Sequence, residues 1–182
     1  EGLRLLKGMY AFVVVDERSK KIFLVRDAIG KKPLFIARWG DDVFFGSSLL
    51  PLAAVRGRAV ELNASQAVYY WKHAFIHPGS SAFAGAAPVL PGQVLELDWS
   101  GGLVREARCE PKPVLLYGGE SPGHVVENVG SLVRTAVGRR LAHNHDPVAL
   151  LSGGVDSTLV TSVAHDLCLH DASLTPLKSL TL

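Results

Sequence analysis

The residues best placed for chemistry form one short segment, Ser152-Gly153-Gly154-Val155-Asp156-Ser157. An apolar run ends just before it at Leu151, and a stretch with helical periodicity follows it. Two adjacent glycines let the backbone turn sharply and approach a ligand closely. The free N–H groups and the positive dipole of a following helix favour an anion. The segment therefore predicts a phosphate-binding loop between a strand and a helix.

A missing lysine excludes a Walker-type loop. That loop needs Gly-Lys-Ser/Thr so that an ammonium group can reach the outer phosphates, whereas no lysine occurs between His143 and Pro176. A plain Gly-Ser turn between an ordinary strand and helix stays open as an alternative. We favour nucleotide binding, because strand, loop and helix occur in the required order.

Apolar patterning predicts the elements that position this loop. Residues 147–151 are expected to form a parallel-type strand, residues 156–169 a helix and residues 178–182 the start of another strand, after a helix over residues 122–143. The helical side chains expected to face inward are Val125, Val129, Leu132, Val133, Ala136, Val137, Leu141, Leu159, Val160, Val163 and Leu167. This order is typical of the opening of a doubly wound parallel sheet, whose ligand site lies at the carboxyl end of its first strand.

The amino-terminal part is predicted to be an α+β arrangement, so that the chain as a whole is α/β. Strands are expected over residues 9–15, 21–25, 34–38, 43–46, 93–97 and 103–108. The first four form two successive hairpins of an antiparallel sheet. Ser47 or Ser48 can cap a short helix through Val55, and Asn63 with Gln66 is similar to a capping box that starts a helix to about residue 72.

Proline and glycine crowd into residues 110–121, which predicts a linker between two domains. The domains are then residues 1–109 and residues 122–182. Because the first residue is not Met and the chain stops abruptly at Leu182, we expect it to be a piece of a longer protein.

Composition argues against several functional classes. The 182 residues are 48% hydrophobic with a formal net charge of +2, which suits a globular protein without the clustered basic stripe of a nucleic-acid groove. A solvated helix face explains Arg134, Arg139 and Arg140. The longest apolar run, residues 9–15, is too short to cross a bilayer, and Asp16-Glu17-Arg18 stands where a signal peptide would have small residues. We expect neither a nucleic-acid nor a membrane partner.

Two pairs of histidines are discounted as ligand sites. His73 and His77 have the i, i+4 spacing of a metal pair, but a Pro-Gly pair ends the helix there and no third ligand is evident. His143 and His145 fit a polar surface turn better than a phosphate contact. No metal site is predicted from either pair.

Two groups of motifs carry a family resemblance. Residues 8–12 (Gly-Met-Tyr-Ala-Phe) with Asp16, residues 26–35 (Arg-Asp-Ala-Ile-Gly-Lys-Lys-Pro-Leu-Phe) and residues 44–48 (Phe-Phe-Gly-Ser-Ser) resemble the back half of a class II, Ntn-type glutamine amidotransferase domain. Phe-Ala-Gly at 83–85 with Leu-Pro-Gly at 90–92 resembles the segment leading out of that domain. Ser-Gly-Gly-x-Asp-Ser after a strand resembles the pyrophosphate loop of ATP pyrophosphatases. In this order the motifs resemble the asparagine synthetase family over nearly the whole chain.

The resemblance implies an ATP-dependent amide ligase. In that family a glutaminase domain releases ammonia from glutamine, and a second domain uses ATP and magnesium to adenylate a carboxylate that ammonia then attacks. The carboxylate is that of aspartate in asparagine synthetase itself, so glutamine and aspartate are the implied substrates, and a homodimer is compatible with this interpretation. The resemblance implies that Asp156 helps to place magnesium. It also implies that the backbone of Leu150 and Leu151 lies beside the nucleotide. The nucleotide-binding residues that it implies are Leu150, Leu151, Ser152, Gly153, Gly154, Asp156 and Ser157.

No catalytic residue of the family's glutaminase site can be assigned to this chain. The nucleophile there is a cysteine at the mature amino terminus, and the glutamine-binding residues also precede the hairpins. Cys109 and Cys168 lie far apart with no partner at metal spacing, which predicts buried, reduced thiols of a cytoplasmic protein. We therefore expect the 182 residues alone to be inactive.

Arg26 and Asp27 could form a catalytic pair. A hairpin that needs Gly30 and Pro33 at fixed turn positions explains their spacing as well. We favour this structural interpretation.

Two other functions stay open. A β-lactam synthetase or a peptide-cyclising relative would adenylate an internal carboxylate and use no ammonia, and a non-catalytic homologue would act as a binding or structural module. A cysteine directly after the initiator Met would favour the glutamine-using ligase.

Overall fold

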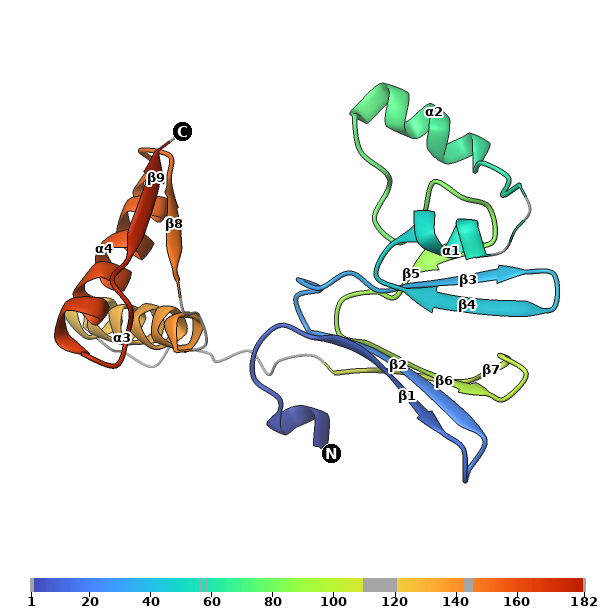
Figure 1. Cartoon of the computed structure of the whole chain (residues 1–182), viewed down its shortest axis with the longest axis horizontal. Helices are drawn as coiled ribbons and strands as arrows, with labels where there is room; N and C mark the ends of the chain where they lie inside the picture. The colour runs from blue at the N-terminus through green and yellow to red at the C-terminus, as the bar shows by residue number, and fades with distance from the viewer. Residues whose placement is uncertain (1, 56, 58, 110–120, 143–145, 182) are drawn as a thin grey trace. The chain divides into compact units, whose positions relative to one another are not determined.

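The computed structural model describes residues 2–55, 57, 59–109, 121–142 and 146–181 (Figure 1). Contacts between Cα atoms group the chain into two compact units, Glu1–Lys112 and Pro113–Leu182. Each unit has its own cluster of buried apolar side chains. Of the predicted linker, Ser121 alone belongs to the described residues.

The first sheet of unit 1 has four antiparallel strands in the order β1-β2-β6-β7. The strands are β1 Ala11–Asp16, β2 Lys21–Arg26, β6 Gln93–Asp98 and β7 Leu103–Arg108, and a short 3₁₀ helix, Gly2–Leu5, precedes them. Ala11 pairs with Arg26, which confirms the first predicted hairpin. Lys21 pairs with Asp98 across β2 and β6, so this sheet joins segments far apart in the sequence.

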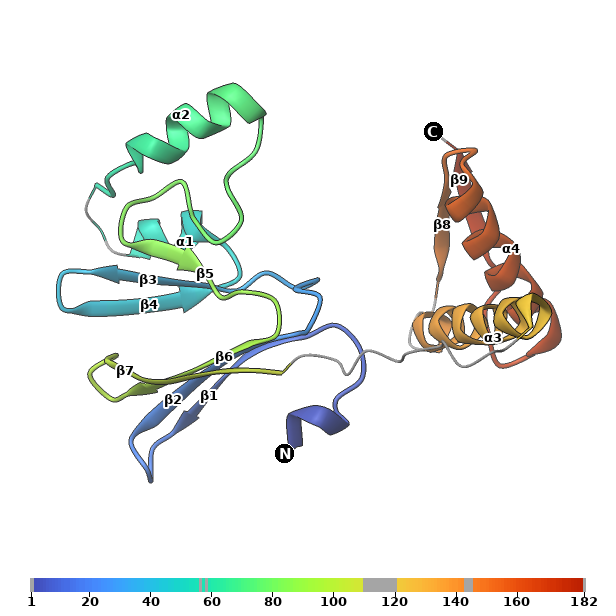
Figure 2. The same cartoon turned by 180° about the vertical axis from the view of Figure 1, so that it is seen from behind.

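The second sheet of unit 1 has three antiparallel strands in the order β4-β3-β5. β3 Phe35–Trp39 and β4 Asp42–Gly46 form the second predicted hairpin. β5 Ala86–Pro88 pairs with the other edge of β3 and was not predicted, because three residues are too few for an alternating pattern. Helices α1 Leu49–Val55 and α2 Ala64–His73 lie on the side of this sheet that faces away from the first sheet (Figures 1 and 2).

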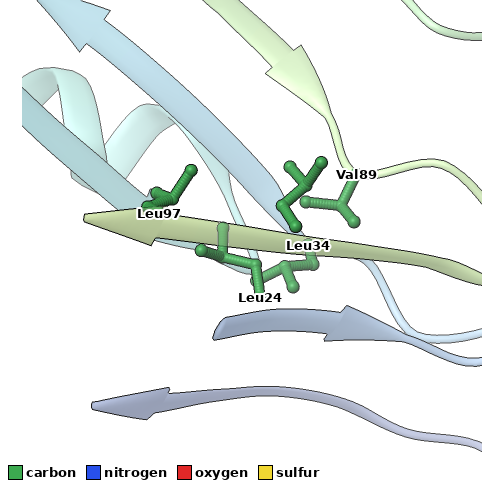
Figure 3. Packing of buried hydrophobic residues seen from close by; sticks show 5 residues of the cluster. Leu24, Leu34, Val89 and Leu97 are labelled. Atoms are coloured by element: carbon green, nitrogen blue, oxygen red, sulfur yellow. The ribbon is translucent and has the colours of Figure 1, made fainter. Parts of the chain in front are cut away.

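The main hydrophobic core lies between these two sheets. Leu24 and Leu97 come from the first sheet, Leu34 and Val89 adjoin strands of the second, and Figure 3 shows these four side chains together. Leu95 completes the buried set. Burying one such side chain contributes about 1.5–3 kcal/mol. The cluster therefore fixes the face-to-face packing of the sheets and the loops that connect them.

Two helices and a pair of parallel strands make up the described part of unit 2. They are α3 Pro122–Leu141, β8 Val148–Leu151, α4 Val155–His170 and β9 Lys178–Thr181. β8 pairs in parallel with β9, with Leu150 opposite Leu180. Helix α4 is the connection between the two strands, as parallel pairing requires. Antiparallel sheets with helices, followed by this parallel pair, confirm the predicted α/β class.

Local capping residues explain where two helices begin. The Ser121 hydroxyl accepts the N–H of His124 at 3.4 Å, and Pro122 suits the first position of α3. The Asn63 side chain accepts the N–H of Gln66 at 3.3 Å and caps α2. The predicted capping box is only half formed, because Asn63 donates its own N–H to the Ala82 carbonyl and Gln66 accepts the N–H of His77.

Five side chains predicted to face inward are exposed instead, and Ala136 is one of them. The other four are large apolar side chains. The exposed fractions are 46% for Val129, 62% for Leu132, 50% for Leu159 and 47% for Val160. The prediction was wrong for these residues, because two helices and two strands offer little surface to cover them. In the described part of unit 2, the buried apolar residues are Val137, Leu141 and Ala164. Within the described residues, no helix has an apolar stretch long enough to span a bilayer.

Candidate phosphate-binding loop

The predicted loop lies at the carboxyl end of β8, where it leads into α4 (Figure 1). Leu150 and Leu151 are the last two residues of the strand. Ser152 and Gly153 form the turn, and Gly154 is the N-cap of α4. Asp156 and Ser157 lie in the first turn of the helix. The structure thus brings all seven predicted residues to one end of a strand–loop–helix unit.

The backbone of the loop leaves the start of α4 open. Gly153 has a φ of +78°, which favours glycine, and no described atom lies within 4 Å of the position a Cβ would take there. Gly154 is extended, with φ −76° and ψ 160°, and no side chain caps the helix. Because the first N–H groups of a helix have no partner within it, α4 presents donors and a positive dipole end to the loop. This geometry fits a phosphate group.

Two hydroxyl groups donate to the Gly154 carbonyl, and a third lies beside one of them. The Ser157 hydroxyl donates to this oxygen at 3.1 Å and lies 3.1 Å from the Ser152 hydroxyl. The Thr158 hydroxyl donates to the same oxygen at 2.8 Å, and so does the Thr158 N–H at 3.1 Å. Thr158 was not predicted as a site residue, although a threonine four residues after Gly154 is placed to bond back to its carbonyl.

Asp156 is exposed in the first turn of α4. The helix dipole favours a carboxylate at this position even without a ligand. Among the described residues, no three His, Cys, Asp or Glu side chains are grouped so that they could hold a metal ion. Magnesium usually combines one or two carboxylates with water and substrate phosphates. Asp156 therefore fits as a single protein ligand to a magnesium ion that a nucleotide would share.

A hollow of about 360 Å³ lies elsewhere in unit 2. Its wall is mostly apolar and is formed by side chains of α3, the start of β8, α4 and Leu177. Residues 152–157 are not part of this wall. The hollow is an uncovered part of the apolar face of unit 2 and is separate from the predicted loop.

Arg26 and Asp27 organise a loop in unit 1 rather than pairing with each other. The Arg26 guanidinium donates to three backbone carbonyls, those of Gly30 at 2.7 Å, Lys32 at 2.8 Å and Val89 at 2.6 Å. The Asp27 carboxylate accepts backbone N–H groups of residues 29, 31 and 32 at 3.0–3.1 Å. These bonds fit a role of Arg26 and Asp27 in shaping the turn, the interpretation favoured from the sequence over a catalytic pair.

The ionisation of Asp27 reflects this cage of donors. Burial of the carboxyl group acts to raise its pKa, but the N–H groups of Lys31, Lys32 and Ile29 outweigh burial. The pKa of Asp27 therefore lies below its ordinary value. The charged form of Asp27 is the one that the folded loop stabilises.

His73 and His77, the first pair of histidines discounted as ligands, lie beside the ring of Tyr69. The ring centroids of His73 and His77 are 4.4 and 5.4 Å from that of Tyr69. Helix α2 ends at His73, because Ala74 takes a left-handed φ of 61°, so His77 lies beyond the helix. His143 and His145 lie outside the described residues.

Both cysteines are free thiols and are half-buried rather than buried as predicted. Cys168 packs against the apolar cluster of unit 2. Cys109 donates its N–H to the Gly92 carbonyl at 2.7 Å at the end of β7. Burial raises the pKa of the nearby Tyr10, and Cys109 and Asp27 add to that rise. Cys168 lies near the last residue of α4, at the other end of the helix from the predicted loop.

The basic side chains of α3 lie on a solvated face. Arg134, Arg139 and Arg140 are all exposed, as expected from the sequence. Arg134 forms an ion pair with Asp166 of α4. This pair links the two helices of unit 2.

Two family models match the chain in the order of its two units. A model described as glutamine amidotransferase domain matches residues 1–106, and a model described as asparagine synthase matches residues 128–181. The second match contains the whole predicted loop, residues 152–157.

Curated relatives match across both units. Asparagine synthetase [glutamine-hydrolyzing] 3 of Bacillus subtilis (strain 168) is 29% identical over 163 residues, covering 87% of this chain and 26% of that protein. Asparagine synthetase [glutamine-hydrolyzing] of Mesocricetus auratus is 32% identical over 173 residues, covering 87% of this chain and 27% of that protein. The chain thus spans about a quarter of the length of the curated relatives it matches.

A solved structure also aligns with most of the chain. It is the glutamine phosphoribosylpyrophosphate amidotransferase of B. subtilis in complex with ADP and GMP, with a TM-score of 0.38 and 18% identity over 97% of this chain and 33% of that one.

The family matches, taken with the order of the two units, show that the chain belongs to the asparagine synthase family.

Proposed function

We propose that this chain forms part of a glutamine-dependent, ATP-using amide ligase whose acceptor acid is aspartate. One observation carries the proposal. Residues 152–157 form an open helix start at the carboxyl end of a parallel strand, within the segment that matches the asparagine synthase model. The names of the curated relatives, which state glutamine hydrolysis and asparagine synthesis, supply the substrates.

In the proposed reaction, the loop binds pyrophosphate, the group that leaves ATP when the carboxylate is adenylated. A carboxylate is a poor electrophile until one of its oxygens belongs to a good leaving group, and ATP supplies AMP for that purpose with release of pyrophosphate. In this proposal the N–H groups at the start of α4 and the hydroxyls of Ser152 and Ser157 bind the pyrophosphate. Such preorganised donors stabilise charge that develops in the transition state. The backbone of Leu150 and Leu151 lies beside the nucleotide, and Asp156 helps to place magnesium.

The two units take separate roles in the proposal. Residues 1–109 form the carboxyl-side part of the glutamine amidotransferase domain, and residues 122–182 the start of the synthetase domain, with residues 110–121 as a linker. The free cysteines are consistent with a cytoplasmic protein. Glutamine and aspartate are the proposed small-molecule partners.

The test is formation of AMP and pyrophosphate that depends on aspartate. We expect the complete gene product that contains this sequence to show it, and Asp156→Ala to abolish it while thermal unfolding stays close to native. Asp166→Asn, in the same helix but away from the loop, is the matched control and should retain activity. Unchanged turnover in Asp156→Ala would contradict the site assignment.

The same assay separates the alternatives. Pyrophosphate release without any need for glutamine or ammonia would favour a β-lactam synthetase or a cyclising ligase, whose gene product would lack a cysteine after the initiator Met. Absence of nucleotide binding would favour a non-catalytic homologue. For the 182 residues alone we expect neither glutamine hydrolysis nor synthesis, and glutaminase activity in that chain would refute this expectation.

A further inference from the structure

The Gly154 carbonyl has more donors than it can bind well. The Thr158 N–H, the Thr158 hydroxyl and the Ser157 hydroxyl all point to this oxygen, at 3.1, 2.8 and 3.1 Å. A carbonyl oxygen has two lone pairs. The two hydroxyls therefore compete for one acceptor position, and the Thr158 hydroxyl makes the shorter contact.

The Ser157 hydroxyl has a second neighbour as well as the carbonyl. It lies 3.1 Å from the Ser152 hydroxyl, and it has a single proton to donate. When that proton bonds to Gly154, it is not available to a ligand at the loop. Anything that occupies the Gly154 oxygen in its place makes the proton of Ser157 available.

We infer that Thr158 is a positioning residue for the phosphate-binding loop, because its hydroxyl occupies the Gly154 carbonyl and releases the Ser157 hydroxyl to bind pyrophosphate. The inference rests on the proposed function of the loop and adds a residue that does not itself contact the ligand. Threonine or serine can fill this role at position 158, whereas valine has a similar shape but no hydroxyl.

The experiment is a double-mutant cycle read by pyrophosphate binding. The ¹⁵N-labelled 182-residue chain is titrated with sodium pyrophosphate in the presence of magnesium, and the amide signals at the start of α4 report the Kd. Thr158→Val should raise the Kd about three- to tenfold, the range expected from one hydrogen bond. Thr158→Ser should bind within about twofold of native, and Thr161→Val, one turn further along α4, is the control for a valine in this helix.

The Ser157→Ala background separates positioning from a general structural effect. In that background Thr158→Val should change the Kd by less than about twofold, because no Ser157 proton is left to release. The same loss in both backgrounds, or native affinity in Thr158→Val alone, would overturn the inference about Thr158 only. No saturable binding by the native chain, or native affinity in Ser157→Ala, would overturn the proposed role of the loop together with the inference.

Discussion

The Arg26 guanidinium donates to the carbonyl oxygen of Val89, 63 residues further along the chain, at 2.6 Å. The same side chain also bonds to the carbonyls of Gly30 and Lys32. A single planar group therefore holds the loop after β2 against the segment that follows β5. Arg26 thus links the two sheets of unit 1.

Replacement of Arg26 by lysine should destabilise unit 1. A lysine ammonium lacks the planar fork that reaches three carbonyls at once. We expect Arg26→Lys to lower the free energy of unfolding by about 1–3 kcal/mol, the usual range for lost hydrogen bonds to a charged group. Urea unfolding followed by circular dichroism measures this change, with Arg18→Lys in the exposed β1–β2 turn as the control. A loss no larger than that of the control would show that the three bonds add little.

A methyl group at position 30 should meet both backbone strain and a clash. Gly30 has a φ of +68°, and a Cβ there would stand 2.7 Å from Cγ of Pro91. Gly40 has nearly the same φ, +69°, with no described atom within 4 Å. The matched substitutions therefore separate the two effects. We expect Gly40→Ala to cost about 1 kcal/mol, and Gly30→Ala to cost more by about 1–3 kcal/mol from overpacking. Equal losses in thermal unfolding would contradict the predicted clash.

Asp27 should make unit 1 sensitive to acid. Its pKa in the folded protein lies below the unfolded value of about 3.9. Its contribution is therefore fully present above the unfolded pKa and is lost as the pH falls through the folded pKa. We expect the free energy of unfolding in urea to fall between pH 5 and the acid limit, and to fall less steeply in Asp27→Asn. Asp41→Asn, in an exposed turn, should keep the native slope. An identical slope in Asp27→Asn would exclude this carboxyl group as the cause.

Local patterns predicted the elements of the fold better than the contacts between them. The hairpins β1–β2 and β3–β4 and the strand–loop–helix of unit 2 follow from apolar periodicity and turn residues. β5 could not be predicted, because Ala86–Pro88 is a strand only through its pairing with β3. The pairing of β2 with β6 has no local signal at all.

Burial was predicted less well than secondary structure. The periodicity of α4 places Leu159 and Val160 on an apolar face, but half of each side chain is exposed. Periodicity reports which face is apolar, whereas burial depends on how much surface is packed against that face. The positions of the loop residues were predicted, because each is set by its own strand or helix. The spacing of Thr158 and Gly154 permits their contact, but the rotamer that forms it is not fixed by the sequence pattern.

The pairing of Lys21 with Asp98 also bears on how the chain folds during synthesis. β2 cannot pair with β6 until β6 has been synthesised. The strands of the second sheet and the helices α1 and α2 are synthesised between the two. At a synthesis rate of about 5–20 residues per second, the edge of β2 that pairs with β6 stays unpaired for several seconds. Non-local pairing of this kind slows folding. During synthesis the β1–β2 hairpin therefore presents an unpaired strand edge, which is a template for pairing with other chains.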